Sequence, residues 1–263
     1  MGQVIFVSAG PGAADLITLR GARALAKADV VLFDALTDPA LREHAPKAQW
    51  IDVGKRGFCH STAQAAINAL LVRHAQSCAV VVRLKGGDAS VFGRLEEEMQ
   101  ALTLAGIAFE VVPGVTAALA AAAQLQRPLT RRGLGRSVSL RTAMTREGQL
   151  VAAGPVSGDV LPHDDAADTE VYYMAGRQLP QMGAQLIAAG WPAQTPALVV
   201  SKAGCPDMAS SDHTLATLDS ASKLHQDRPA LLIVGAGAMS IDGFPDRKAL
   251  IDVHQHQVQG PSD

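Results

Sequence analysis

The sequence predicts an α/β protein of two domains, with a mostly parallel sheet in the first and a mixed sheet in the second. In the N-terminal half, short apolar runs rich in β-branched residues alternate with helical patterns. That alternation is typical of parallel strands covered by helices on both faces. In the C-terminal half, several such runs lie close together along the chain, which favours a mixed sheet. The length of 263 residues is sufficient for two domains of ordinary size.

We expect an N-terminal domain over residues 1–120, a C-terminal domain over 121–240 and a poorly ordered tail over 241–263. The boundary is expected near residues 117–130, where an Ala-rich helical pattern is followed by an arginine-rich stretch. The polar tail, ending in HQHQVQGPSD, is expected to add nothing to the core.

Five strands and three helices are predicted in the first domain from the periodicity of their apolar residues. The strands are predicted at residues 4–7, 30–33, 50–53, 80–84 and 107–112. The helices are predicted at residues 15–27, 61–74 and 116–124, and a further helical pattern opens after Arg94. In the second domain, we expect strands at residues 170–174, 197–201, 214–218 and 230–234, a helix at 179–189, and a loop over 150–168.

Composition excludes several classes of partner. The net charge is −2, so no overall field attracts nucleic acid or an acidic membrane. The apolar segment at residues 4–7 is too short for a signal sequence or a membrane span, and no basic residue precedes Arg20. Three cysteines without metal-ligand spacing are typical of a reducing compartment. We therefore expect a cytoplasmic protein with no nucleic-acid or membrane partner.

Glycine and polar residues follow the predicted strands of the first domain. They are the Gly-Pro-Gly at residues 10–12, Asp34, Lys55, the Gly-Gly-Asp at residues 86–88, and Thr116. The carboxyl ends of parallel strands meet at one edge of a sheet, where open α/β sheets bind ligands. The sequence therefore predicts a ligand site at this edge.

The Gly10-Pro11-Gly12 loop allows three interpretations. Asp34 follows at the distance of a ribose-binding acid, as in a dinucleotide fingerprint. The third glycine of that fingerprint is absent, however, and Asp15 would repel a pyrophosphate. The alternatives are a simple tight turn and a site for an adenosine-type ligand without phosphates. The adenosine-type ligand is favoured.

The Gly86-Gly87-Asp88 stretch is either a strand–helix turn with an aspartate that caps the helix, or a loop that a ligand approaches closely. Asp34 and Lys55 are similarly open to a structural or a catalytic interpretation. The eight histidines show no pair at metal-ligand spacing outside the tail, so we predict no metal site.

Six arginines and no lysine occur between residues 126 and 147. They form either a solvated face or a site for a substrate with several carboxylates, because the planar guanidinium binds carboxylates in a bidentate manner. They are Arg127, Arg131, Arg132, Arg136, Arg141 and Arg146.

Several strings together resemble the tetrapyrrole methylase family: AGPGAADLITLRGARALAKAD, VGKRG, VVRLKGGD, VFGR, AGIAFEVVPGVTAA and RPLT, with weaker matches in YYMAG, TPALVVSKAG and RPALLIVGAG. The resemblance covers about residues 3–238. It implies two α/β domains with S-adenosyl-L-methionine bound in the cleft between them, S-adenosyl-L-homocysteine as product, no metal and a homodimer. The implied reaction is C-methylation of uroporphyrinogen III, a tetrapyrrole with several carboxylates, to precorrin-2 for sirohaem or cobalamin synthesis.

The resemblance also implies roles for individual residues. The cofactor contacts would be Pro11, Gly86, Gly87, Asp88, Val91, Thr116, Ala117, Met174 and Ala203. The catalytic positions would be Asp34 and Lys55 for proton handling, and Arg94 and Glu97 for holding the substrate or assisting its deprotonation.

The chain departs from the family pattern at several of these loops. Ser8 replaces a glycine, Ala89-Ser90 replaces Pro-Phe, and Leu95-Glu96 replaces Gly-Gly. These changes leave two alternatives open: a methylase of the same fold acting on another precorrin or on ribosomal RNA, and a degenerate paralogue that binds without turnover.

Overall fold

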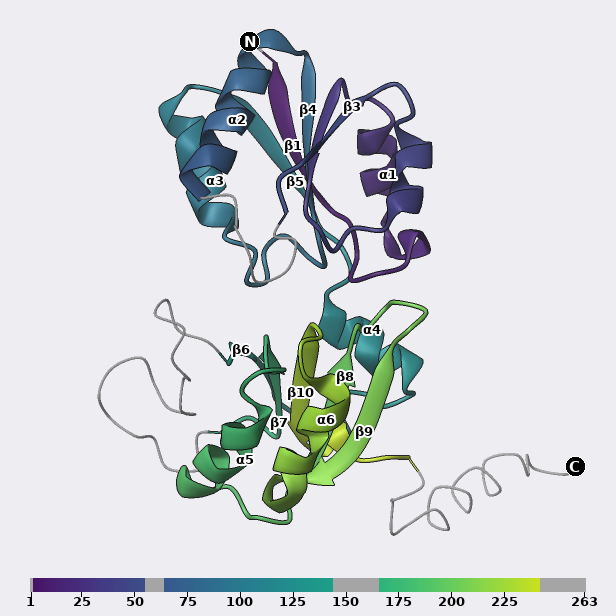
Figure 1. The fold of residues 1–263 in the computed structure, drawn as a ribbon, viewed down its shortest axis with the longest axis vertical. Coiled ribbons are helices and arrows are strands. Elements are labelled where there is room, and N and C mark those ends of the chain that lie inside the picture. The colour runs from purple at the N-terminus through teal and green to yellow at the C-terminus, as the bar shows by residue number, and fades with distance from the viewer. Residues whose placement is uncertain (1, 55–63, 144–165, 242–263) are drawn as a thin grey trace, which may run out of the picture.

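The computed structural model describes residues 2–54, 64–143 and 166–241. Within these ranges the chain forms two five-stranded sheets, one above the other in Figure 1, with helix α4 (Ala117–Gln124) between them. This architecture confirms the predicted fold class, a parallel N-terminal sheet followed by a mixed C-terminal sheet. None of the helices in the described ranges is long and apolar enough to cross a membrane.

The N-terminal sheet has the strand order β3-β2-β4-β1-β5, and all its pairs are parallel. Its strands are β1 (Gln3–Ser8), β2 (Val30–Phe33), β3 (Gln49–Asp52), β4 (Val80–Lys85) and β5 (Ala108–Val112). Helix α1 (Leu19–Leu25) covers one face, and α2 (Gln64–Ser77) and α3 (Leu95–Leu104) cover the other (Figure 1). Each face carries its own apolar core, which explains why the central strands are apolar on both sides.

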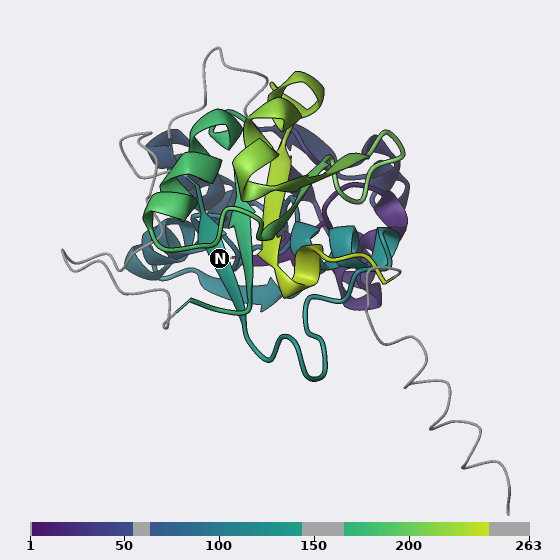
Figure 2. The same ribbon diagram turned by 90° about the horizontal axis from the view of Figure 1, so that it is seen from below.

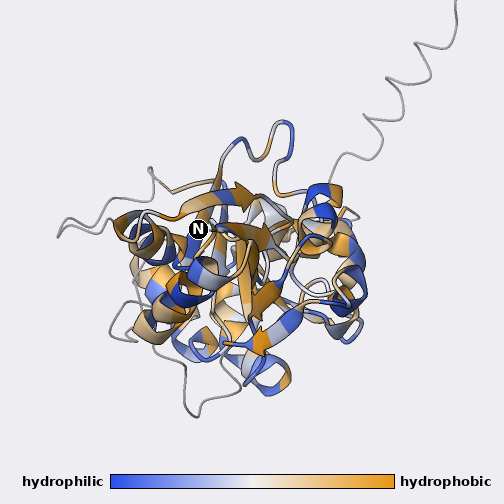
Figure 3. Ribbon diagram, turned by 90° about the horizontal axis from the view of Figure 1, so that it is seen from above, coloured by the Kyte–Doolittle hydropathy of each residue, from blue (hydrophilic) through white to orange (hydrophobic). Residues whose placement is uncertain are grey.

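The C-terminal sheet has the order β6-β7-β10-β8-β9, in which only the β6–β7 pair is parallel. Its strands are β6 (Val138–Thr142), β7 (Thr169–Tyr173), β8 (Pro196–Ser201), β9 (Ala209–Thr214) and β10 (Ala230–Gly235). Helix α5 (Leu179–Ala188) packs against the 3-10 helix Leu215–Ala221, which continues into α6 (Ser222–His225), on one face (Figure 2). Helix α4 packs on the opposite face through Ala118 and Ala121. Figure 3 shows the apolar residues concentrated on the strands of both sheets.

Two predicted elements differ from the structure, and two strands of the second sheet were not predicted. The predicted strand at 214–218 is wrong, because Leu215 and Leu218 are one turn apart on a 3-10 helix that begins at a Thr214–Thr217 capping box. The edge strands β6 and β9 were not predicted. The helix predicted from residue 15 instead begins at Leu19, since the Thr18 side chain accepts a hydrogen bond from the Gly21 N–H and caps it there.

Candidate active site

A cavity lies between the carboxyl edge of the N-terminal sheet and the C-terminal sheet. It encloses about 760 Å³ of space, its open mouth included. All nine residues predicted as cofactor contacts line it: Pro11, Gly86, Gly87, Asp88, Val91, Thr116, Ala117, Met174 and Ala203. Leu36, Tyr173 and Lys202 complete its walls, together with residues of β8 and β10.

The glycine loops after β1 and β4 are joined by a reciprocal backbone pair. The Gly87 N–H donates to the Gly10 carbonyl over 2.7 Å, and the Gly10 N–H donates to the Gly87 carbonyl over 3.2 Å. Both residues have positive φ, 81° at Gly10 and 69° at Gly87, which a side chain would strain. A Cβ atom at Gly87 would meet no protein atom within 4 Å, so the backbone there opens onto the cavity.

Asp88, in the cavity lining, connects its own loop after β4 to the loop after β5. Its Oδ2 accepts the Gly114 N–H over 2.8 Å, and its Oδ1 accepts the Ser90 N–H over 2.8 Å. Partial burial raises the pKa of Asp88, but hydrogen bonds from Ser90 and Gly114 outweigh it and hold the pKa below its usual value. The carboxylate is therefore ionised. It does not cap a helix, since α3 begins after Arg94.

The far wall is tied to the N-terminal loops by side chains. The Tyr173 hydroxyl and the Thr116 hydroxyl lie 2.6 Å apart, and the rings of Phe92 and Tyr173 are in contact with centroids 5.1 Å apart. Met174 follows at the end of β7 with φ 58° and a half-exposed side chain. These contacts place residues from both sheets around one ligand-sized space.

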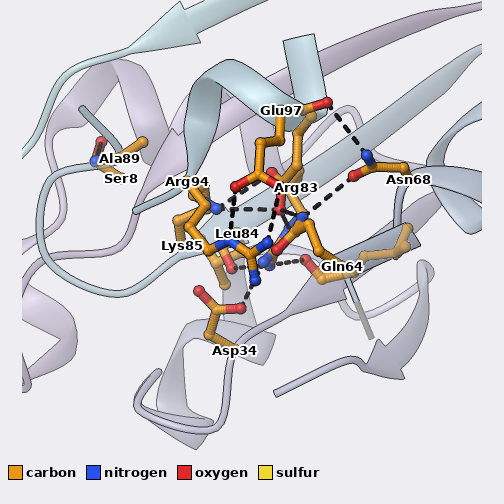
Figure 4. A network of polar contacts seen from close by, with 12 residues as sticks. Ser8, Asp34, Gln64, Asn68, Arg83, Leu84, Lys85, Ala89, Arg94 and Glu97 are labelled. Atoms are coloured by element: carbon orange, nitrogen blue, oxygen red, sulfur yellow. Dashed lines mark hydrogen bonds and ion pairs between the residues drawn. The ribbon is translucent and has the colours of Figure 1, made fainter. Parts of the chain in front are cut away.

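Asp34 lies at the end of β2 and belongs to a buried ionic network (Figure 4). Its Oδ1 accepts the Arg83 Nη2 over 2.6 Å, and the Arg83 Nε donates to Glu98 Oε1 over 3.2 Å. Lys85 Nζ lies 3.2 Å from both oxygens of Glu98, and Gln64 donates to Glu98 Oε1 over 3.0 Å. Burial, then the neighbouring Arg83, lower the pKa of Lys85, and Glu98 and Asp34 oppose this shift.

Arg94 and Glu97 form a bidentate ion pair at the start of α3. The Nε–Oε1 and Nη2–Oε2 distances are both 2.7 Å, and about half of each side chain is exposed. Neither residue lines the cavity, nor does Asp34; all three lie around the network of Arg83 (Figure 4). Lys55, the other predicted catalytic position, lies outside the described residues.

Sequence reasoning missed Arg83, Lys85 and Glu98. The signal was present in the run VVVRLKGG, where two cations two positions apart project to the same face of a strand that is buried. Buried charges require partners, so a carboxylate facing them was to be expected.

Three of the six arginines after residue 126 already hold partners within the chain. Arg127 pairs with Asp212, Arg131 donates to the Met239 carbonyl, and Arg141 pairs with the buried Glu170. Half of the arginines proposed to bind substrate are therefore engaged in internal contacts. Arg146 lies outside the described residues. In the described part of the chain, no group of His, Cys, Asp and Glu side chains is placed to hold a metal ion.

Comparisons with known proteins identify the family to which the chain is similar. Residues 3–219 match the family model of the tetrapyrrole (corrin/porphyrin) methylases. A uroporphyrinogen-III C-methyltransferase of Pseudomonas aeruginosa is 40% identical over 93% of this chain and 97% of that protein. A sirohaem synthase of Sodalis glossinidius is 41% identical over 89% of this chain, which spans only 48% of that longer protein.

A solved structure has the same fold with a ligand related to the predicted cofactor. The uroporphyrin-III C-methyl transferase of Thermus thermophilus, complexed with S-adenosylhomocysteine, superimposes with a TM-score of 0.75 at 35% identity, over 89% of this chain and 97% of that one. The cavity, the glycine loops and these matches show that the chain belongs to the tetrapyrrole methylase family.

Proposed function

We propose that the chain is an S-adenosylmethionine-dependent uroporphyrinogen-III C-methyltransferase that forms precorrin-2. The observation that carries this proposal is the cavity between the sheets, whose lining contains all nine residues that the resemblance implies as cofactor contacts. The similarity to a methyltransferase with bound S-adenosylhomocysteine supports the cofactor, and the Pseudomonas aeruginosa relative supports the acceptor.

The lining fits S-adenosylmethionine better than a dinucleotide. Its walls are mostly apolar, Asp88 contributes a negative charge, and the Gly87 backbone is open to the ligand. Asp15 lies in the 3-10 helix Ala14–Leu16 that follows the first glycine loop, where it disfavours a pyrophosphate. When bound, S-adenosylmethionine supplies an electrophilic methyl group on its sulfonium.

In this proposal the protein positions the reactants and accepts a proton. The glycine loops and Thr116–Ala117 orient the cofactor, and positioning contributes most to such a transfer. The half-exposed Arg94 binds a carboxylate of the tetrapyrrole through its planar fork. Asp34, partly exposed and held by Arg83, accepts the proton that the methylated carbon loses. Glu97 orients Arg94, and Lys55 assists proton handling.

The same proposal includes a homodimer in the cytoplasm, and a domain boundary near residue 120. An apolar groove beside α4 and β6 supports the dimer, because Leu119, Leu140 and Ile241 line it with about half of each side chain exposed. Light scattering during size-exclusion chromatography tests the dimer directly.

The function is tested by anaerobic incubation with enzymatically generated uroporphyrinogen III and S-adenosylmethionine that carries a labelled methyl group. Two labelled methyl groups per tetrapyrrole would support the proposal. Absence of label in the tetrapyrrole, with S-adenosylhomocysteine still bound in calorimetry, would reject this acceptor. A panel of other precorrins and ribosomal RNA then separates a different acceptor from a paralogue without turnover.

A further inference from the structure

The guanidinium of Arg83 is held on every side by groups of the protein. Its Nη1 donates to the Leu84 and Leu32 carbonyls over 3.0 and 3.4 Å, its Nη2 to Asp34, and its Nε to Glu98. The side chain is 3% exposed. Because all three nitrogens of this planar group are hydrogen-bonded, the guanidinium has one orientation available. A shift of Glu98 would therefore move the guanidinium and, with it, Asp34.

Glu98 is the centre of the same network and is completely buried. Its Oε1 accepts from Arg83, Lys85 and Gln64, and its Oε2 accepts from Lys85. The network therefore combines strand β4, which carries both cations, with α2 and the first turn of α3. Glu97 lies on that same turn of α3, and its partner Arg94 is the residue just before the helix.

Stability is a weak reason for this arrangement. Taking two cations and a carboxylate out of water is costly, and apolar replacements of buried ion pairs are often neutral or stabilising. The two carboxylates, Asp34 and Glu98, balance the two cations in charge, and only Asp34 reaches solvent, with 30% of its side chain exposed. Asp34, the one partly exposed group of the network, is also the proposed proton acceptor. The buried Arg83, Lys85 and Glu98 lie on its protein side.

We propose that Arg83 and Glu98 are positioning residues for methyl transfer. Glu98 fixes the plane of the Arg83 guanidinium, and Arg83 fixes the carboxylate of Asp34 toward the substrate side of the sheet edge. Through its place on α3, Glu98 also fixes the distance between Asp34 and the Arg94–Glu97 pair. This inference rests on the proposed function and extends it to residues that touch neither cofactor nor substrate.

The first experiment measures steady-state kinetics of Arg83→Lys, Arg83→Met and Glu98→Gln. Lysine keeps the charge of Arg83 but lacks the fork, so it cannot hold Asp34 and Glu98 at once. We expect kcat to fall about 10- to 100-fold in Arg83→Lys and Glu98→Gln, because a small misplacement of a reacting group has this effect. Arg83→Met is expected to lose more than Arg83→Lys. The dissociation constant of S-adenosylhomocysteine is expected to stay within about threefold of the wild-type value.

Glu170→Gln is the matched control. Glu170 is a buried glutamate paired with Arg141 over 2.9 Å, and it lies on the face of β7 opposite the cavity. Its loss is expected to lower the melting temperature without changing kcat. If Arg83→Lys and Glu98→Gln also lower only the melting temperature, or if they weaken cofactor binding as much as kcat, the positioning role is wrong.

A second measurement keeps this inference separate from the proposed function. Crystal structures of the wild type and of Arg83→Lys are compared at Asp34. We expect the Asp34 carboxylate to turn away from its wild-type orientation in the variant, even if uroporphyrinogen III proves not to be the acceptor. An Asp34 carboxylate in the same orientation in both structures would overturn the inference. No methylation by the wild type would overturn the proposed function alone.

Discussion

The backbone N–H of Ala13 donates to the carbonyl of Gly204 over 2.8 Å, and this bond joins the loop after β1 directly to the loop after β8. The two loops belong to different sheets, and Pro11 and Ala203, beside the two bonded residues, both line the cavity. The contact therefore ties the two sides of the cavity together. A Cβ atom added at Gly12 or Gly204 would overlap the opposite loop.

Gly12→Ala should open the contact between these loops. A Cβ atom at Gly12 would lie 2.5 Å from the Gly204 carbonyl carbon and 2.7 Å from the Cys205 nitrogen, and backbone atoms cannot move aside singly. We expect the affinity for S-adenosylhomocysteine to fall at least about tenfold, a change of about 1.4 kcal/mol. Calorimetry measures it, with Gly133→Ala as control: its φ of 80° strains an alanine, but the added Cβ meets no protein atom and Gly133 does not line the cavity. Unchanged affinity in Gly12→Ala would show that the loops do not set the cavity.

Ser8→Ala should destabilise the fold although serine is not the family residue at this position. The buried Ser8 Oγ accepts the N–H of the buried Ala89 over 3.0 Å, and the variant leaves that donor without its partner (Figure 4). We expect a loss of about 1–3 kcal/mol in the free energy of unfolding, measured by urea titration. The exposed Ser77→Ala is the control, with an expected change within about 0.5 kcal/mol. Equal effects at both positions would contradict this role of Ser8.

Arg94→Ala should abolish turnover while the cofactor still binds. Arg94 lies outside the cavity lining and presents a half-exposed guanidinium, so in the proposed role its loss removes a substrate contact and leaves the cavity lining intact. We expect kcat/KM for the tetrapyrrole to fall at least about 100-fold. Arg177→Ala is a matched control, because Arg177 is equally exposed and paired with Asp227. Loss of cofactor affinity with an unchanged rate at saturation would refute the assignment of Arg94.

Stability should fall in mild acid because of His225. This fully buried ring lies between Ser201 and Ser211, at 3.0 and 2.9 Å. Burial, then the positive charge of His213 and of Arg228, lower the pKa of His225 from 6.5 to about 4.

The unfolded chain binds a proton at this histidine first, so the stabilisation is complete above about pH 6.5 and is lost as the pH falls toward about 4. Protonation of His225 changes the free energy of unfolding by at most about 1.4 kcal/mol per pH unit. His225→Gln should flatten the dependence of the unfolding free energy on pH in this range. An equally steep dependence in the variant would contradict the prediction.

The strands and the glycine loops of the N-terminal sheet could be predicted from sequence because their signals are local. The β-branched run before Gly86 and the positive φ of Gly87 are properties of a few neighbouring residues. The edge strand β6 could not be predicted, since it offers only Val138 and Leu140, both partly exposed. The cofactor positions came from the resemblance, and the structure places them along one cavity.

The partners of Asp34 were beyond sequence reasoning because they are brought together by tertiary structure. Arg83 lies 49 residues from Asp34 along the chain, and Gln64 lies 34 residues from Glu98. Three consecutive glutamates begin α3, and nothing local distinguishes the buried Glu98 from the exposed Glu96 and Glu97. Glu98 is buried, and the other two glutamates are exposed, only because of the way α3 packs against β4 and α2.

The proposal that the cavity binds the cofactor while Arg94 serves the substrate is tested most directly by calorimetric titration with S-adenosylhomocysteine. Ala117→Leu fills the cavity from the first turn of α4, and Ala69→Leu adds the same volume at an exposed position of α2. We expect the wild type, Arg94→Ala and Ala69→Leu to bind one ligand per chain with similar affinity, and Ala117→Leu to lose at least about 100-fold, or about 2.7 kcal/mol. Wild-type affinity in Ala117→Leu, or its loss in Arg94→Ala, would contradict the account.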